Sequence, residues 1–193
     1  MDISQKIRVF LVHGWDGSPN GNWFPWLKKN LDAKYFSVTS IAMPNPGEPK
    51  CQSWVATLDD AVGTPDEKTI FIGHSLGCIT ILRYLEQLQA GEKILAAILV
   101  AGFSEPIGYE EIDHFFQPPL NYNIIKGRSQ AFIAIQSDDD PYVPFGQGIT
   151  MNEKLGATII PMHNAGHIGS DDGFTELPEV LEMVNVVSRK LVD

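Results

Sequence analysis

The chain has 193 residues, of which 44% are hydrophobic and 20% are charged, proportions typical of a globular protein. We predict that residues 1–193 form one domain, because a chain of this length can bury one sizeable core. Its 24 acidic and 14 basic residues give a formal net charge of -10, which argues against nucleic acid as a partner. No apolar stretch approaches the roughly 18 residues of a membrane span, so no membrane association is expected.

Cysteine content and the first residues bear on the cellular compartment. The two cysteines, Cys51 and Cys78, are too few for a disulfide framework and fit a reducing environment. Cys78 is expected to be a small buried apolar residue. Met1–Gln5 lack the charged and apolar regions of a secretory signal peptide. We therefore expect a cytoplasmic protein.

Strand-like and helix-like segments alternate along the chain. Six apolar runs are predicted strands: Ile7–Val12, Val38–Ala42, Thr69–Ile72, Leu95–Ala101, Ala131–Gln136 and Thr158–Met162. Five segments with helical spacing lie between or after them: Asn22–Tyr35, Ser53–Val62, Cys78–Gln89, Gln147–Leu155 and Leu177–Val192. This alternation predicts an α/β fold, a three-layer α/β/α sandwich around a mostly parallel six-stranded sheet.

Two segments do not fit this alternation. Met43–Lys50 contains three prolines and a glycine and is predicted to be an irregular loop. Phe103–Gly127 is long and rich in aromatic residues, and a short helix is expected near Glu110–Phe116. Because it leaves a strand at the edge of the sheet where ligands bind, it is interpreted as a small lid or pocket wall. An ordinary packed excursion is the equal alternative.

Residues 73–77 read Gly-His-Ser-Leu-Gly and match the nucleophile elbow, Gly-x-Ser-x-Gly. A buried strand precedes them and a helix follows. The sharp turn between the two would hold Ser75 in a strained conformation with its hydroxyl exposed. Gly73 and Gly77 would let the strand and the helix pass close together. At a helix N-terminus the serine would also lie where free N–H groups favour negative charge.

A serine hydroxyl needs a base, usually a histidine that is oriented by a carboxylate. His167 follows the last strand on a glycine-containing loop, where the base is expected. His163 is interpreted as a loop or packing residue, and His163 and His167 lack a third partner for a metal site. His13 and His74 are expected to support loops around the site, and His114 to be polar surface.

Three consecutive aspartates, Asp138, Asp139 and Asp140, follow the fifth predicted strand. One of them is predicted to orient the histidine, although residue chemistry does not separate the three. A solvated turn is the plain alternative, and a calcium loop would need further ligands at the proper spacing.

Two backbone N–H groups are predicted to bind the oxyanion of an acyl-transfer reaction. The first is that of Leu76, directly after the nucleophile. The second comes from the loop after the first strand, which begins His-Gly-Trp at 13–15, and Trp15 is the candidate. A tight turn without a catalytic part is the alternative for this loop.

Seven segments along nearly the whole chain carry a resemblance to known proteins. They are Val-His-Gly at 12–14, Trp-Phe-Pro-Trp-Leu-Lys-Lys at 23–29, Met-Pro-Asn-Pro at 43–46, Gly-His-Ser-Leu-Gly-Cys at 73–78, Leu-Val-Ala-Gly-Phe at 99–103, Asp-Asp-Pro-Tyr-Val-Pro at 139–144 and Gly-His at 166–167. With them the chain resembles the α/β-hydrolase superfamily and, within it, the small YdeN-type serine hydrolases related to retinoblastoma-binding protein nine.

The resemblance implies a minimal α/β-hydrolase fold without a large cap. It also implies a triad of Ser75, Asp140 and His167, with Asp140 chosen by its place in Asp-x-x-Val-Pro. No metal or organic cofactor is expected. A retinoblastoma partner is not implied, because Leu-Gly-Cys-Ile-Thr at 76–80 departs from the Leu-x-Cys-x-Glu motif. The oligomeric state is not predicted.

The expected reaction is hydrolysis of a small carboxylic ester through an acyl-enzyme on Ser75. An amidase or aminopeptidase-like hydrolase with the same triad is the enzymatic alternative. A binding protein that keeps the fold without turnover is the rival from another class, since function lies in the site and not in the fold.

Overall fold

The computed structural model describes residues 6–192, so Met1–Gln5 and Asp193 lie outside the described residues. Within this described part, six strands form one sheet in the order β2-β1-β3-β4-β5-β6, and each neighbouring pair is parallel. The strands are β1 (Ile7–Val12), β2 (Phe36–Ile41), β3 (Thr69–His74), β4 (Ile94–Val100), β5 (Ser129–Ser137) and β6 (Thr158–Met162).

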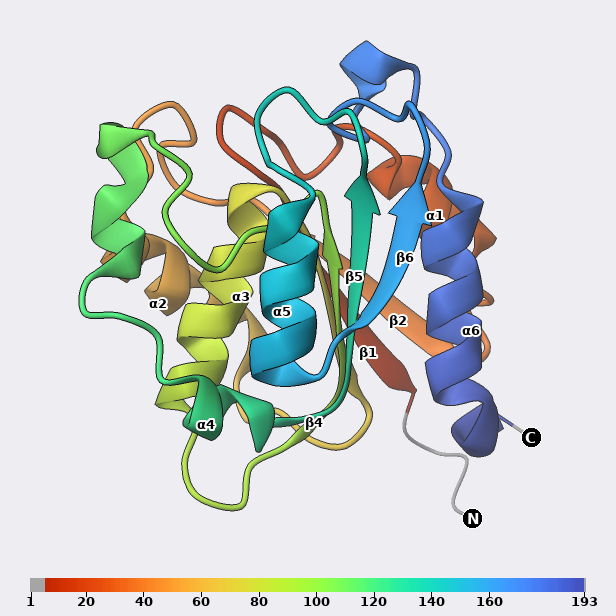
Figure 1. Cartoon of the computed structure of the whole chain (residues 1–193). Helices are drawn as coiled ribbons and strands as arrows, with labels where there is room; N and C mark the ends of the chain where they lie inside the picture. Colours follow the sequence, from red (N-terminus) through yellow and green to blue (C-terminus); the bar gives the residue numbers. More distant parts are fainter. Residues whose placement is uncertain (1–5, 193) are drawn as a thin grey trace.

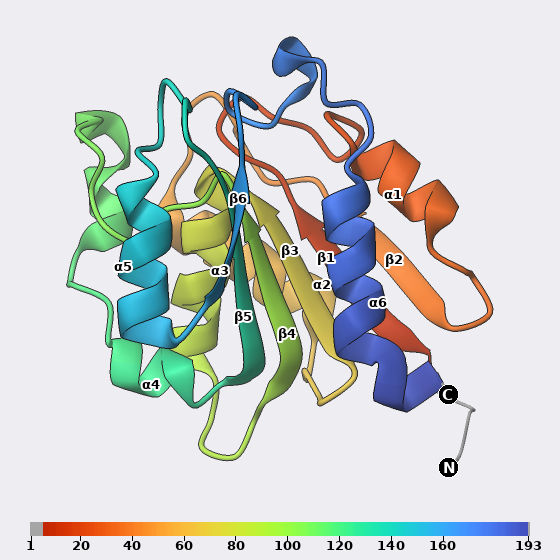
Figure 2. The same ribbon diagram turned by 45° about the vertical axis from the view of Figure 1, so that its right-hand side comes forward.

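Helices cover both faces of the sheet (Figures 1 and 2). One layer contains α1 (Phe24–Asn30) and α6 (Pro178–Val192). The other contains α2 (Cys51–Val62), α3 (Leu76–Gln87), α4 (Tyr122–Lys126) and α5 (Gly146–Leu155). The fold is therefore the predicted three-layer α/β/α sandwich, with a sheet that is entirely rather than mostly parallel.

The central strands are apolar on both faces because helices cover both. Every residue of β3 and of β4 is buried. Alternate residues of β3 pack into different hydrophobic clusters. Phe71 packs in the cluster beneath α2 and α3, and Ile70 and Ile72 pack in the cluster beneath α1 and α6. A parallel strand buried on both sides needs such a continuous apolar run. The strand register also brings the carboxyl ends of the strands to one edge, where the loops that follow β1, β3, β5 and β6 meet (Figure 1).

The predicted bounds of β1 and β6 are confirmed, and those of β2 to β5 differ by one or more residues at an end. The largest error concerns α1, which covers Phe24–Asn30 and not Asn22–Tyr35. Asn22 has a positive φ of 51°, which a helix does not allow. At the other end, Asp32 accepts a hydrogen bond from the backbone N–H of Lys34, a local turn that competes with helix.

Helix α3 begins at Leu76, two residues before the predicted start. The helix includes Gly77, which looks like a loop residue in the sequence but lies in the first turn. Its C-terminal end, at Gln87, is also two residues earlier than predicted. The helix α5 begins one residue earlier than expected, at Gly146, and α2 two residues earlier, at Cys51.

The segment 103–127 contains the short 3-10 helix η1 (Glu110–Phe116) at the predicted place, followed by α4. It packs on the core through Ile112, Phe115 and Phe116, all of which are buried. The buried Arg83 of α3 holds this segment in place, because it donates hydrogen bonds to the backbone oxygens of Phe115, at 2.6 Å, and of Pro118. The segment is thus a packed excursion that also supplies a pocket wall, as described below.

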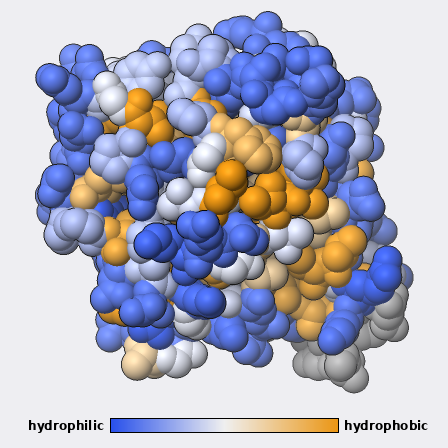
Figure 3. Space-filling view, in the orientation of Figure 1, coloured by the Kyte–Doolittle hydropathy of each residue, from blue (hydrophilic) through white to orange (hydrophobic). Residues whose placement is uncertain are grey.

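Figure 3 shows apolar side chains that gather on the face over β6 and α6. β6 is an edge strand of the sheet, and several of its residues are exposed or half-buried.

Among residues 6–192, no helix is both long enough and apolar enough to cross a lipid bilayer.

Candidate active site

Ser75 lies at the sharp turn between β3 and α3, with φ 53° and ψ -121°. A positive φ is unfavourable for a residue with a Cβ atom, so the surrounding structure must hold the turn. The backbone N–H of Ser75 donates to the Val100 oxygen at the end of β4, 2.9 Å away. The strained serine predicted from the Gly-x-Ser-x-Gly pattern is therefore present.

Close packing around this turn requires residues without side chains. A Cβ atom on Gly77 would lie 2.2 Å from the backbone oxygen of Val12, because α3 crosses the end of β1 there. A Cβ atom on Gly73 would lie 2.9 Å from the backbone nitrogen of Cys78. Gly14 faces the serine itself, since a Cβ atom there would lie 2.8 Å from the Cβ of Ser75.

His167 and Asp140 form a hydrogen-bonded pair beside the serine. The Nδ1 atom of His167 lies 2.8 Å from Oδ2 of Asp140, whose side chain is completely buried. The carboxylate accepts, so Nδ1 carries the proton and Nε2 is left as a hydrogen-bond acceptor. The other carboxylate oxygen accepts from the backbone N–H groups of Tyr142 and Val143, which fixes the aspartate in place.

The structure separates the three consecutive aspartates. Asp138 pairs with His163 at 2.5 Å on the surface, and this hydrogen bond lowers the pKa of the carboxyl and raises that of the imidazole. Asp139 accepts from the hydroxyl of Ser137 and from the backbone N–H of Gly166. Only Asp140 of the three contacts His167 within the described chain. The role of Asp140 in catalysis stays a prediction.

His74 supports the backbone of His167. Its Nε2 donates to the backbone oxygen of His167 at 2.9 Å, and its Nδ1 lies 3.4 Å from the Nδ2 atom of Asn22. Burial, and next the nearby His167 side chain, lower the pKa of His74 to about 4. His74 is therefore neutral at pH 7.

The other histidines have structural surroundings. His13 accepts the backbone N–H of Met43 at 3.1 Å, and burial lowers its pKa. It thus positions the irregular Met43–Lys50 loop, as expected. The expectation for His114 was wrong, because it is half-buried and accepts the N–H of Cys51 at the start of α2. A cap of this kind is invisible in the sequence, where the two residues are 63 positions apart.

The two predicted oxyanion donors lie at the same end of the sheet. Leu76 is the first residue of α3, and its N–H belongs to the helix N-terminus. Within residues 6–192, the N–H groups of Leu76 and Trp15 have no protein acceptor, so both are free to bind a ligand. The indole of Trp15 donates to the backbone oxygen of Gly47, which joins its loop to Met43–Lys50.

Ser75 and His167 line two adjoining cavities, named here the polar lobe and the apolar lobe. The polar lobe has a volume of about 390 Å³ and lies among the loop after β1 and the turn η2 (Ser170–Asp172). The apolar lobe, of about 420 Å³, is walled by Phe103, Ile107, Tyr109, Ile112 and Val143. The serine and the histidine therefore lie where the two lobes meet.

Sequence reasoning missed two residues that shape the site. Asn22 contacts His74 and also accepts from the backbone N–H and hydroxyl of Ser170. Asp172 accepts the backbone N–H of His167 at 2.9 Å. Neither residue stands in a sequence motif. Asn22 itself has a positive φ, and Asp172 lies between Gly166 and Gly173, which also have positive φ. The only signal in the sequence is that each residue is an Asn or Asp next to a glycine, Asn22 after Gly21 and Asp172 before Gly173.

The amino-acid sequence is similar to those of known proteins over most of its length. A family model described as serine hydrolase matches residues 9–186. The chain belongs to the serine hydrolase family. YdeN of Bacillus subtilis (strain 168), a proposed hydrolase, is 35% identical over 178 residues, which cover 92% of this chain and 94% of YdeN. Serine hydrolase RBBP9 of Rattus norvegicus is 29% identical over 174 residues, which cover 89% and 88% of the two chains.

Solved structures agree with the fold. The crystal structure of the ydeN gene product from B. subtilis superposes with a TM-score of 0.90 at 34% identity, covering 95% of this chain and 98% of that chain. A monoacylglycerol lipase from Paleococcus ferrophilus has a TM-score of 0.65 at 15% identity, covering 94% and 92%. The second likeness shows that the α/β-hydrolase fold is shared. The expected family and fold class are thus confirmed, and the chain is a YdeN-like serine hydrolase.

Proposed function

We propose that this serine hydrolase cleaves small carboxylic esters through an acyl-enzyme on Ser75. The observation that carries the proposal is the pairing of His167 with buried Asp140 at 2.8 Å, on a cavity that Ser75 also lines. The pairing leaves Nε2 of His167 able to accept a proton. A hydroxyl is a weak nucleophile, and such a base is what activates it.

In the proposed reaction, the Oγ atom of Ser75 attacks the ester carbonyl as His167 takes its proton. Asp140 holds the Nδ1–H tautomer and stabilises the imidazolium ion that forms. His167 then protonates the departing alkoxide, and the alcohol leaves an ester on Ser75. Water that is deprotonated by His167 attacks this ester, which releases the carboxylic acid and restores the serine.

The tetrahedral oxyanion would be bound by the N–H groups of Leu76 and Trp15. Both are without a protein acceptor in the described part of the chain, and one belongs to the N-terminus of α3. A single donor of this kind is worth about 3 kcal/mol in the transition state. Neutral His74 adds no positive charge beside the imidazolium.

The apolar lobe favours an apolar acyl group. Its aromatic and aliphatic wall excludes water from a short hydrocarbon chain, and its volume of about 420 Å³ suits a small substrate. A panel of p-nitrophenyl esters tests this proposal. Faster cleavage of apolar acyl chains than of charged ones is expected, and a clear preference for compact, charged acyl groups would contradict it.

Amide or aminoacyl substrates are the second candidate because the polar lobe is acidic. Asp16, Asp171 and Asp172 line it, and no lysine or arginine does among the described residues. Carboxylates favour a protonated amine on the substrate. Comparing p-nitrophenyl esters with aminoacyl anilides separates the two candidates, since only an amide-cleaving enzyme would turn over the anilides at a comparable rate.

The decisive experiment is labelling of purified protein with a fluorophosphonate probe. Labelling of the wild type is expected to vanish in Ser75→Ala and to fall strongly in His167→Ala. His163→Ala is the matched control, because His163 lies on the surface and pairs with Asp138 instead. Folded wild type that takes no label would overturn the hydrolase proposal in favour of a binding protein.

A further inference from the structure

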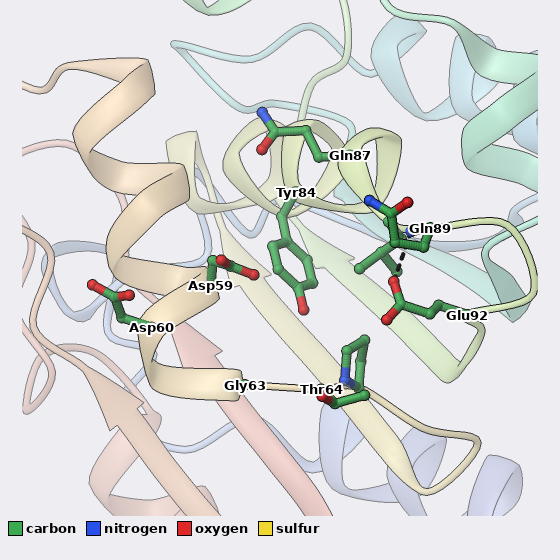
Figure 4. A pocket seen from close by; sticks show the side chains of 10 residues that line it. Asp59, Asp60, Gly63, Thr64, Tyr84, Gln87, Gln89 and Glu92 are labelled. Atoms are coloured by element: carbon green, nitrogen blue, oxygen red, sulfur yellow. Dashed lines mark hydrogen bonds between the residues drawn. The ribbon is translucent and has the colours of Figure 1, made fainter.

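A further cavity lies far from Ser75, between the C-terminal ends of α2 and α3. It has a volume of about 530 Å³. Figure 4 shows it, with side chains from both helices and from the loops after them. Ser75 stands at the other end of α3, about 18 Å away along a helix of 12 residues. The proposed hydrolysis does not use this cavity, named here the α2–α3 groove.

The α2–α3 groove is negatively charged. Asp59, Asp60 and Glu92 line it, and its lining contains no lysine or arginine among the described residues. Neither helix has a basic residue in its last turn. The C-terminal ends of two helices therefore add their partial negative charge to the three carboxylates, and none of the described residues that line the groove is a lysine or an arginine.

The nearest arginine is already engaged. Arg8 donates to the backbone oxygens of Val62 and Thr64 at 2.9 and 2.8 Å, so it offsets part of the negative charge at the end of α2 without lining the groove. It also pairs with Asp66 at 3.5 Å.

An unpartnered hydroxyl group points into the groove. Tyr84 of α3 is 1% exposed, and its Oη atom has no hydrogen-bond partner among residues 6–192. In Figure 4 the hydroxyl is directed between Asp59, Glu92 and the backbone at Gly63 and Thr64. Burial raises the pKa of Tyr84 most, Asp59 and Glu92 raise it further, and Arg8 opposes them only in part, so the hydroxyl stays protonated. A buried polar group without a partner is unfavourable, and a ligand donor or acceptor would satisfy it.

We propose that the α2–α3 groove binds a small aliphatic polyamine through Asp59, Glu92 and the Tyr84 hydroxyl. Ammonium groups donate up to three hydrogen bonds each, and the groove offers carboxylate, amide and hydroxyl oxygens as acceptors. A metal ion is disfavoured, because no group of three metal-ligating side chains with suitable geometry occurs in the described residues. An elongated organic cation also suits the volume of the groove.

Isothermal titration calorimetry with spermidine, at about 0.15 M salt to screen diffuse attraction, tests the proposal. The wild type is expected to bind one spermidine saturably. The double variant Asp59→Asn/Glu92→Gln should lose affinity by at least about tenfold, and Tyr84→Phe by about fivefold. The matched control is Glu153→Gln/Glu182→Gln, which removes two exposed carboxylates elsewhere. It should bind as the wild type does.

Tyr84→Phe keeps the ring that packs edge-on against Phe71, at 5.3 Å between centroids. Its melting temperature is expected to equal or exceed that of the wild type, because the unpartnered hydroxyl is gone. Equal loss of affinity in the groove and control double variants would overturn the proposal in favour of diffuse charge. Unchanged affinity in Tyr84→Phe would overturn the role of the hydroxyl. Displacement of spermidine by equimolar Mg²⁺ would contradict the preference for an amine.

Discussion

His74 donates a hydrogen bond from Nε2 to the backbone oxygen of His167, 2.9 Å away. The residue directly before Ser75 thereby supports the loop that carries the proposed base. The two rings lie 4.9 Å apart between centroids. A positive charge on His74 would oppose the imidazolium that the proposed reaction forms on His167. Burial lowers the pKa of His74 and keeps it neutral at pH 7, so no such charge opposes the proposed reaction.

The low pKa of His74 predicts acid sensitivity of the fold. Between pH 6.5 and about 4 the unfolded chain binds a proton at His74 and the folded protein does not, so stability falls as the pH falls. A shift of this size corresponds to about 3 kcal/mol of unfolding free energy. Urea unfolding at pH 7 and pH 4 measures it, and His74→Gln should lose about 3 kcal/mol less over this range.

His163→Gln is the control for the pH prediction. The pKa of His163 is raised by its hydrogen bond to Asp138, so the folded state binds this proton more tightly. Removing His163 should therefore make the unfolding free energy fall more steeply as the pH falls, whereas removing His74 should make it fall less steeply. An unchanged pH dependence in His74→Gln would contradict the assignment.

Asp140 and Asp138 provide a matched pair for testing the triad proposal. Asparagine at 140 would donate to Nδ1 of His167 and force the proton onto Nε2, which then no longer accepts from Ser75. We expect Asp140→Asn to lower kcat on a p-nitrophenyl ester by about 10⁴. Asp138→Asn changes only the surface pair with His163, and should leave kcat within about threefold of the wild type. Similar losses in both variants would contradict the assignment of Asp140.

Gly77 is expected to be intolerant of any side chain. Alanine would place its Cβ 2.2 Å from the Val12 oxygen, and both groups belong to backbone that is fixed by the sheet and by α3. Gly77→Ala should therefore lower the unfolding free energy by about 3 kcal/mol. Gly146→Ala is the control, since its Cβ would meet nothing within 4 Å at the start of α5. Urea denaturation should find the control at least as stable as the wild type.

Arg83 links the pocket wall to the helix that follows the nucleophile. It is 5% exposed, donates to Phe115 and Pro118 and pairs with Glu86 at 2.8 Å. Arg83→Met leaves these acceptors unpaired and should cost about 3 kcal/mol of stability. It should also raise KM for apolar esters, because the segment 103–127 lines the apolar lobe. Arg189→Met, at an exposed position on α6, should change neither quantity.

The fold was predictable because several parallel strands, β3 and β4 above all, are almost continuous apolar runs. The pattern of β3 needs no tertiary information, since both of its faces are buried. The ends of the elements were harder to predict. Gly77 looks like a residue that ends structure, yet lies in the first turn of α3 because only glycine fits beside Val12. Asn22 stands next to residues with helical spacing, so the sequence places it in the helix. In the structure it has a positive φ and forms hydrogen bonds with His74 and Ser170.

Motif residues of the site were predictable, whereas their supports were not. Ser75 and His167 stand in short patterns at strand ends, so strand order alone brings them to one edge. The choice among three aspartates needed either a resemblance or coordinates, because residue type is identical at 138, 139 and 140. Asn22 accepts from the backbone N–H of Ser170, 148 positions away, and Asp172 accepts from that of His167, five positions away. No sequence motif records either bond.

The hydrogen bonds of Asn22, His74 and Asp172 have a consequence for how the protein opens. They tie together the loops that follow β1, β3 and β6, and each bond crosses from one loop to another or closes the loop of His167. No one of these loops can unfold locally without breaking contacts made by the others. The edge of the sheet that carries Ser75 is therefore a single cooperative unit, whose amide hydrogens would exchange with solvent together.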